Sequence, residues 1–318
     1  MSEATDAQKP PKYSAVIPVY NSADLVGQTI DRVVAFFEGQ GWDYELIAVN
    51  DGSPDGSWEV IRDKAQENEH IVAVNLLRNY GQHTALACGL QKSTGDCVIT
   101  MDDDLQNPPE EIAHLVEKMQ DGHDVVFGRF REKKHPGYRR AGSRMIGLIN
   151  RRIFHQPRDL VVGNFRIMRR DVVDRICAYR SRYPYINGLA LMFSADPANV
   201  VVEHEERHAG KSQYGPLKIA ELCMRILFNY SAFPLRLACL LGVGIAAISF
   251  LLGAFYFCRA LFVGSRVPGW TSTIVLLSFF NGVSLLILSM LGEYSIRVLT
   301  QTSSANVYHV REEINTDV

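Results

Sequence analysis

Five short apolar segments, separated by amphipathic stretches, dominate the first 130 residues of this 318-residue chain. Segments of this length have the size of buried strands, whereas residues 25–37 and 58–65 repeat their apolar positions as helices do. A chain that alternates strands with helices predicts a mainly parallel sheet covered by helices, which is an α/β fold. The predicted strands are residues 13–19, 44–50, 71–77, 97–101 and 124–127.

Three aspartates follow the fourth apolar segment, where an α/β sheet binds its ligands. Asp102 and Asp104 are spaced i, i+2 on an extended segment, so they point to the same side and could share one divalent cation with phosphate oxygens. Taken alone, the triplet is equally consistent with a solvated acidic turn. The next residues, 107–111 (NPPEE), combine a capping residue, prolines and acids, which is typical of a helix start.

Turn-forming residues also follow the first two predicted strands, at 18–21 (PVYN) and 50–56 (NDGSPDG). Asp51 could accept hydrogen bonds from a base or a ribose, and Gly52 would let the backbone come close to a ligand. An ordinary Asx turn is the alternative interpretation of Asp51. The sequence contains neither a phosphate-binding G-x-x-x-x-G-K-[ST] loop nor a G-x-G-x-x-G dinucleotide motif, so neither a P-loop kinase nor a Rossmann dehydrogenase is supported.

Composition excludes several classes of protein. The formal net charge of −2 gives no basic footprint for nucleic acid, so no nucleic-acid partner is expected. The six cysteines include no C-x-x-C pair, which argues against a zinc site or a disulfide framework. Residues 1–12 are polar and lack the apolar core of a signal peptide, so the α/β domain is expected to stay in the cytoplasm.

Two long stretches near the C-terminus, 235–257 and 270–291, are almost free of charge. Each has about 20 residues, enough to cross the hydrocarbon of a bilayer as a helix. We therefore predict a transmembrane hairpin, with a pair of buried core helices as the alternative. The predicted division is a disordered N-terminus (1–12), an α/β domain (13–215) with a membrane-interface helix (139–155), a juxtamembrane amphipathic helix (216–234), the hairpin (235–292) and a cytoplasmic tail (293–318).

Together, these features resemble the family 2 glycosyltransferases that act on polyisoprenyl phosphates. That family includes dolichol-phosphate mannose synthase and bacterial undecaprenyl-phosphate transferases for glucose and for aminoarabinose-type sugars. The resemblance covers nearly the whole chain after residue 12. It is carried by residues 18–21 (PVYN), 50–53 (NDGS), 78–83 (RNYGQH), 102–111 (DDDLQNPPEE) and the two C-terminal uncharged stretches.

The resemblance implies a GT-A domain that binds a nucleotide sugar and transfers the sugar, with inversion, to a polyisoprenyl phosphate. The expected donor is UDP-linked, with a GDP-sugar as the alternative, and the expected acceptor is undecaprenyl phosphate. Mg²⁺ or Mn²⁺ is the expected cofactor. The place implied is the cytoplasmic face of the bacterial inner membrane, in a homo-oligomer such as a tetramer, and the product would serve cell-envelope glycans such as lipopolysaccharide.

By the same resemblance, particular residues receive roles. The metal stabilises the charge that accumulates on the leaving diphosphate. Arginines can bind phosphate through two hydrogen bonds at once, with a basic surface helix and a flexible loop as the alternative interpretation. The implied metal ligands are Asp102, Asp104 and Gln106, and catalysis would involve Asp104, Asn164 and Arg166. The acceptor phosphate would contact Arg129, Arg144 and Arg166. The donor nucleotide would contact Pro18, Tyr20, Asn21, Asp51, Asp102, Asp103, Arg207 and Lys211.

The sequence departs from the family pattern at two positions. Ser22 stands where relatives commonly have an acid, and Asn164 stands where many have an aspartate proposed to act at the acceptor. An amide cannot act as a general base, but a lipid monophosphate is already anionic near pH 7, so Asn164 is expected to orient the acceptor. These departures also motivate two alternatives, a membrane glycosyltransferase with another acceptor and a catalytically impaired, membrane-tethered scaffold that binds nucleotide sugars. For His83, lining the donor pocket and packing in the core are both open.

Overall fold

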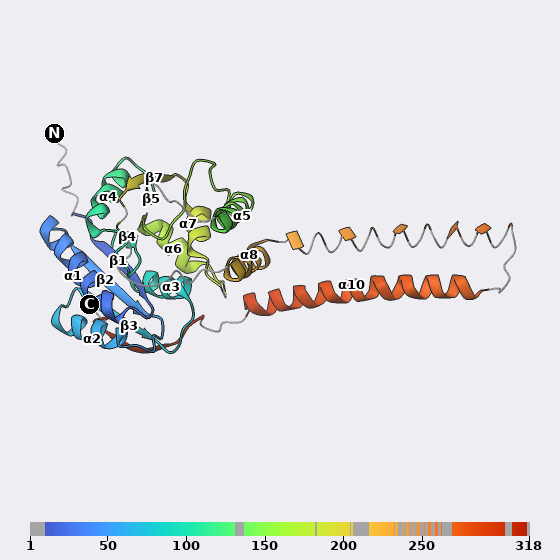
Figure 1. Cartoon of the computed structure of the whole chain (residues 1–318), viewed down its shortest axis with the longest axis horizontal. Coiled ribbons are helices and arrows are strands. Elements are labelled where there is room, and N and C mark those ends of the chain that lie inside the picture. Colours follow the sequence, from blue (N-terminus) through green and yellow to red (C-terminus); the bar gives the residue numbers. More distant parts are fainter. Residues whose placement is uncertain are drawn as a thin grey trace, which may run out of the picture. The chain divides into compact units, whose positions relative to one another are not determined.

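The computed structural model describes residues 10–130, 137–181, 183–203, 205, 216–231, 233–234, individual positions between 237 and 262, and residues 269–302 and 307–316. The chain divides into two compact units (Figure 1). The first unit comprises Met1–Cys223 together with Asn306–Val318, and the second comprises Met224–Ala305.

An eight-stranded sheet forms the centre of the first unit, in the order β7-β5-β6-β4-β1-β2-β3-β8. The four central strands β4, β1, β2 and β3 are parallel, β5 is parallel to β7, and β6 and β8 are antiparallel to their neighbours. The prediction of a mainly parallel sheet is therefore confirmed. The strands are β1 (Tyr13–Val19), β2 (Tyr44–Asn50), β3 (Ile71–Leu76), β4 (Cys97–Thr100), β5 (Val125–Phe130), β6 (Arg166–Arg169), β7 (Pro197–Val202) and β8 (Val310–Ile314).

Helices cover both faces of the sheet (Figure 1). On one face, α1 (Ala23–Gln40) buries an apolar stripe at Val26, Ile30, Val33 and Phe37, which have the i, i+3, i+4 spacing of an amphipathic helix. The helix α2 (Ser57–Glu67) and the helix α4 (Ile112–Gln120), which follows the 3-10 turn η1 (Pro109–Glu111), complete this layer.

The other face is covered by α3 (Gln82–Lys92), α6 (Arg170–Ala178) and α7 (Ile186–Phe193). Gly89 lets α3 lie close to the sheet, because a Cβ there would come within 2.3 Å of Cγ1 of Val16. Since successive strand residues point to opposite faces, the central strands are buried on both sides, as in other helix-covered parallel sheets. The helix α5 (Gly137–Ile153) overlaps the predicted interface helix and exposes Met145 and Leu148.

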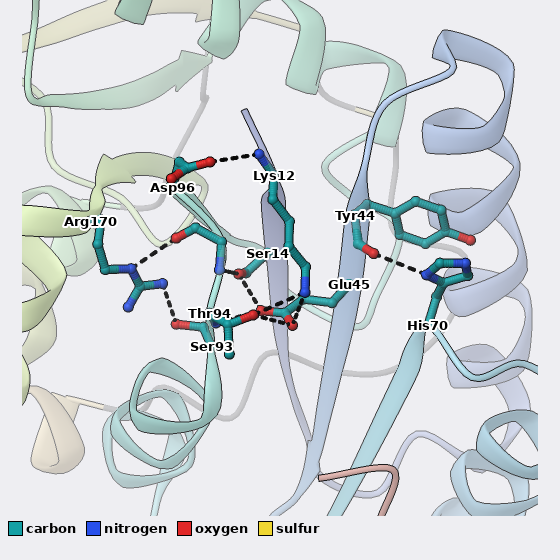
Figure 2. Close-up of polar contacts among 10 residues, drawn as sticks. Lys12, Ser14, Tyr44, Glu45, His70, Ser93, Thr94, Asp96 and Arg170 are labelled. Atoms are coloured by element: carbon teal, nitrogen blue, oxygen red, sulfur yellow. Dashed lines mark hydrogen bonds and ion pairs between the residues drawn. The ribbon is translucent and has the colours of Figure 1, made fainter. Parts of the chain in front are cut away.

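The amino ends of β1, β2 and β4 lie side by side, because Tyr13 is in register with both Tyr44 and Cys97. A polar cluster closes this edge (Figure 2). Glu45 accepts hydrogen bonds from Ser14 Oγ at 2.6 Å and from Thr94 N at 2.6 Å, and Lys12 Nζ lies 3.1 Å from its other oxygen. Burial acts to raise the Glu45 pKa, but these hydrogen bonds outweigh it and hold the pKa below its ordinary value. The charged groups of this edge are therefore paired, whereas the opposite edge, where the strands end, is the one at which α/β sheets bind ligands.

The C-terminal residues add a strand to the sheet. The segment 293–318 was predicted as a cytoplasmic C-terminal tail, and within it Val310–Ile314 forms β8 and pairs antiparallel with β3 at the edge of the sheet. Leu77 N donates to His309 O at 2.9 Å, so the pairing continues to the end of β3. The free hydrogen-bonding groups of the β3 edge explain why this segment is taken up as a strand.

The second unit contains α10 (Trp270–Thr302), which includes the predicted second uncharged span and continues beyond it. Most of the predicted first span, 235–257, lies outside the described residues. Within the part of the chain that the structure describes, no helix combines the length and apolar character needed to cross a membrane. The transmembrane hairpin therefore stays a prediction. The helix α8 (Pro216–Tyr230) begins where the juxtamembrane helix was predicted.

Candidate functional site

The acid motif directly follows β4, at the carboxyl edge of the sheet. Leu105 is buried and has a left-handed backbone conformation with φ of +58°, which turns the chain back after Asp104. Asp104 Oδ1 accepts a hydrogen bond from Gln106 N at 3.2 Å, and the Gln106 side-chain amide donates to Asp104 Oδ2. Two of the three predicted metal ligands, Asp104 and Gln106, are thus held together by this turn.

Asp102 is held by two amides from distant parts of the chain. Its Oδ1 accepts from Gln82 Nε2 at 2.7 Å and from Asn164 Nδ2 at 3.3 Å. The structure therefore places Asn164 beside the acid motif. Gln82 was not predicted as a site residue, although its position at the start of the helix after the third strand placed it at the same edge of the sheet.

Asp103 points away from this pair and toward the loop after β1. Its Oδ2 accepts from Tyr20 N at 3.4 Å, and its backbone oxygen accepts from Thr29 Oγ1 at 2.9 Å. Burial raises the pKa of Asp103 to about 6. Burial also raises the pKa of Asp102 to about 6, and the charges of Asp104 and Asp103 add to that rise.

These residues fit a divalent cation that is shared with a ligand. Repulsion from the charges of Asp104 and Asp103 adds to the effect of burial on the Asp102 pKa, and a cation would relieve that repulsion. Their oxygen atoms are the donors that Mg²⁺ and Mn²⁺ prefer. Within the described ranges, no group of three or more His, Cys, Asp or Glu side chains could hold a metal ion by itself. A site of one or two carboxylates completed by substrate phosphates is the usual arrangement for Mg²⁺.

A further acid of this edge is Asp51, directly after β2. It is 2% exposed, and its two oxygens accept from the backbone amides of Tyr80 at 2.7 Å and Gly81 at 2.8 Å. Burial raises its pKa to about 6 although both hydrogen bonds act in the opposite direction. Gly52 has a φ of +61°, and a Cβ there would lie 2.4 Å from the carbonyl carbon of Arg78. The close approach that Gly52 allows is thus to the loop after β3.

The remaining residues of the predicted nucleotide pocket lie around Asp51. Pro18 is buried within β1, whereas Tyr20 and Asn21 are exposed directly after it. Asn21 has a φ of +54° and its N–H donates to Ser53 Oγ at 3.1 Å, which joins the first two loops.

The loop after β3 contributes a cation–π contact, in which the Arg78 guanidinium lies over the ring of Tyr80, 5.2 Å from its centre. Arg207 and Lys211 lie outside the described residues.

Arg166 is completely buried behind the acid motif. Its Nη1 donates to Asn187 Oδ1 at 2.5 Å, while Nε and Nη2 have no hydrogen-bond partner in the described part of the chain. Burial lowers its pKa to about 10, so it remains charged at pH 7. Burial and the nearby Arg166 lower the pKa of His83 to about 3, so His83 is neutral, with its ring 5.1 Å from that of Tyr185. This packing gives His83 a core position.

The two other arginines predicted to bind the acceptor phosphate have no described contact with the acid motif. Arg129 is exposed near the end of β5. Arg144 belongs to α5, but its side chain lies outside the described residues. The structure therefore brings together Asp102, Asp103, Asp104, Gln106 and Asn164, places Asp51 beside the first two loops, and keeps the Arg166 guanidinium away from the surface.

Comparison with known proteins identifies the family of this chain. Residues 14–177 match the family described as "Glycosyl transferase family 2". The chain belongs to this family. It is therefore an enzyme, a glycosyltransferase, and the acid motif and Asp51 both lie inside the matched region.

Curated relatives of this glycosyltransferase match it over nearly its whole length. One is the undecaprenyl-phosphate 4-deoxy-4-formamido-L-arabinose transferase of Proteus mirabilis (strain HI4320), 33% identical over 306 residues, 95% of this chain and 94% of that protein. The protein of the same name from Shewanella sediminis (strain HAW-EB3) is 34% identical over 302 residues, 94% of this chain and 91% of its own.

The fold also matches solved structures. The crystal structure of glucosyl-3-phosphoglycerate synthase from Mycobacterium tuberculosis, in complex with Mn²⁺, UDP and phosphoglyceric acid, has a TM-score of 0.52 and 17% sequence identity. The match covers 69% of this chain and 76% of that one. At this identity the likeness concerns the fold alone, and it confirms the predicted GT-A type of α/β domain.

Proposed function

We propose that this glycosyltransferase transfers a sugar from a nucleotide sugar to undecaprenyl phosphate. The observation that carries the proposal is the full-length similarity to transferases named for that acceptor, combined with the acid motif at the carboxyl edge of the sheet. The relatives are named for 4-deoxy-4-formamido-L-arabinose, so a 4-amino or 4-formamido pentose is the first sugar to test.

The proposed donor is UDP-linked. Support comes from the Mn²⁺ and UDP bound by a protein of the same fold, and from the buried carboxylate of Asp51 between the first three loops. Asp102 and Asp104 would hold a divalent cation on the donor diphosphate, where it would stabilise the negative charge of the leaving group.

In the proposed reaction an oxygen of the lipid phosphate attacks the anomeric carbon, and the bond from that carbon to the nucleotide diphosphate breaks with inversion. The acceptor is already anionic at neutral pH, so it needs orientation more than proton removal. This agrees with an amide rather than a carboxylate at position 164, since Asn164 can donate a hydrogen bond but cannot accept a proton at neutral pH.

The proposed location is the cytoplasmic face of the bacterial inner membrane, in a homo-oligomer. Its support is the sequence, namely the two uncharged stretches 235–257 and 270–291, and the exposed apolar side chains of Met224 and Phe228 on α8. Fractionation of cells that express the full chain tests this location. Recovery of the chain in the soluble fraction without detergent would contradict it.

The deciding experiment measures transfer of radiolabelled sugar from a panel of UDP- and GDP-sugars into undecaprenyl phosphate, with Mg²⁺ or Mn²⁺ and an EDTA control. We expect a chloroform-soluble glycolipid that forms only with metal, and a preference for UDP donors. Transfer to a non-phosphorylated lipid alone would support a different acceptor. Nucleotide binding without turnover across an extended panel of donors and acceptors would support a non-catalytic scaffold instead.

A further inference from the structure

One turn of the chain contacts two acids of the site, the buried Asp51 and the partly buried Asp102. Gly81 N donates to Asp51 Oδ2 at 2.8 Å, and the next residue, Gln82, donates through its side chain to Asp102 Oδ1 at 2.7 Å. Gln82 is the first residue of α3, so its backbone is fixed by the helix that follows. The loop that closes around the Asp51 carboxylate thus also fixes the first carboxylate of the acid motif.

The second amide on Asp102 comes from the opposite direction. Asn164 precedes β6, and its backbone oxygen accepts from Thr100 Oγ1 at 2.5 Å. The next residue is also fixed, because Phe165 O accepts from Gly128 N at 2.9 Å. The Asn164 side chain is therefore presented to Asp102 from a backbone held on two sides.

Both amides use the same oxygen of Asp102. Its Oδ1 has two donors, whereas Oδ2 has no donor among the described residues. Asp104 is held differently, by Gln106 within its own turn. Groups that orient a ligating carboxylate from behind commonly change metal affinity when they are removed, because a free carboxylate must lose rotational freedom when it binds.

We propose that Gln82 and Asn164 form an amide clamp that fixes Asp102 through Oδ1 and leaves Oδ2 for the divalent cation, so that Asn164 is a positioning residue for Asp102. The inference rests on the proposed function, because the cation is the one carried on the donor diphosphate. It assigns a role to Gln82, and it gives Asn164 a task at the donor side of the site rather than at the acceptor.

The clamp also explains why an amide suits position 164 in this chain. A carboxylate at the same place would set a further negative charge 3.3 Å from Asp102, in a turn that already contains Asp103 and Asp104. Like charges at such a distance repel each other, and these partly buried side chains are less well screened by water than side chains on the open surface. An amide instead donates a hydrogen bond to the ionised carboxylate, and an amide does not titrate.

The test uses the full chain in detergent and Mn²⁺ as the probe, titrated by electron paramagnetic resonance with saturating UDP. Gln82→Met removes one donor and keeps the length of the side chain, and Asn164→Leu removes the other. We expect each substitution to weaken Mn²⁺ binding by about 10- to 100-fold. The double variant should lose less than the product of the two single effects, because both amides act on one oxygen.

Three further measurements separate positioning from general damage. Gln66→Met makes the same change at an exposed position of α2 and should bind Mn²⁺ like the wild type. Binding of UDP in EDTA should be unchanged in Gln82→Met, because the contacts of Asp51 with the backbone of Tyr80 and Gly81 do not use the Gln82 side chain. In the transfer assay the substitution should raise the Mn²⁺ concentration needed for half-maximal rate, and excess Mn²⁺ should restore most of the rate.

The outcomes are distinct. Mn²⁺ affinity within twofold of wild type in both Gln82→Met and Asn164→Leu would overturn the clamp, even if the wild type transfers sugar as proposed. A wild-type protein that binds no Mn²⁺ with either UDP or GDP would refute both the clamp and the metal-assisted donor site. Wild-type binding with no sugar transfer, together with weakened binding in the variants, would support the clamp and contradict the proposed reaction.

Discussion

The indole Nε1 of Trp58 donates a hydrogen bond to Glu312 Oε2 at 3.1 Å, across 254 residues of sequence. Close by, Asn315 Nδ2 donates to the backbone oxygens of Ala65 at 2.7 Å and Ile71 at 2.9 Å. These contacts fasten the C-terminal segment to α2 and to the start of β3. Because β3 leads into the loop that surrounds Asp51, the C-terminal segment supports one side of the proposed donor site.

Ending the chain after residue 305 should therefore destabilise the α/β unit. The truncation removes β8, exposes the edge of β3 and leaves the Trp58 indole without its partner. Since each hydrogen bond contributes roughly 1 kcal/mol net, we expect a loss of about 3 kcal/mol or more in the free energy of unfolding. Urea unfolding followed by tryptophan fluorescence measures it. A chain ended after Thr316 keeps β8 and Asn315 and is the control; equal stability of the two truncated chains would contradict a supporting role for the strand.

Gly52→Ala should disturb the contact between the loop after β2 and the loop after β3. The backbone at Gly52 is left-handed, which costs an L-residue about 1–2 kcal/mol, and the added Cβ would meet the Arg78 backbone at 2.4 Å. We expect lower stability and weaker UDP binding by calorimetry, because the loop that donates to Asp51 must shift. Gly39→Ala is the matched control, since its Cβ would meet nothing within 4 Å inside α1 and should stabilise the helix slightly. UDP affinity equal to wild type in Gly52→Ala would show that the loop adjusts freely.

Asn187→Leu should leave the buried guanidinium of Arg166 without its strongest partner. Hydrogen bonds to charged groups contribute about 1.5–3 kcal/mol, and we expect a loss of that size in urea unfolding. Asn187→Asp keeps an acceptor for Nη1 and is the comparison that should retain most of the stability. If the leucine variant is as stable as the wild type, the Arg166–Asn187 hydrogen bond does not stabilise the fold.

The sequence predicts the central sheet well because β1 and β2 are buried on both faces. Such strands appear as continuous apolar runs, and the predicted segments 13–19 and 44–50 coincide with the observed ones. The position of the acid motif could be predicted for the same reason, since the carboxyl ends of parallel strands share one edge.

The C-terminal strand could not be predicted in this way. The segment Val310–Ile314 (VREEI) carries three charged residues and is exposed over most of its length, so nothing in its pattern distinguishes it from a solvated tail. It becomes a strand only because β3 offers an unpaired edge. Likewise, the contacts of Gln82 and Asn164 with Asp102 depend on the packing of α3 and β6 around the acid turn, which no local pattern encodes.

Asp104→Asn should abolish metal-dependent sugar transfer and leave the chain folded. The substitution removes one of the two charges proposed to hold the cation, but an asparagine still accepts a hydrogen bond from Gln106 N. We expect at least a 100-fold lower transfer rate with an unchanged thermal unfolding midpoint, by analogy with the loss of other groups that stabilise a leaving charge. Asp31→Asn, which alters only an exposed ion pair with Lys64, is the control. A fully active Asp104→Asn enzyme would remove Asp104 from the metal site.

The pKa of Asp102 sets a pH dependence for metal binding. Burial and the charges of Asp104 and Asp103 raise that pKa to about 6, so the carboxylate is protonated below pH 6 and a cation must displace the proton. Mn²⁺ affinity should therefore be constant above about pH 7 and fall by up to about tenfold per pH unit below 6. UDP-glucose is a suitable co-ligand, because its doubly esterified diphosphate does not titrate in this range. Asp103→Asn removes one of the charges that raise the Asp102 pKa and should move the midpoint of the pH dependence to lower pH. A midpoint near pH 4 in the wild type would mean that Asp102 is not the ligand that titrates.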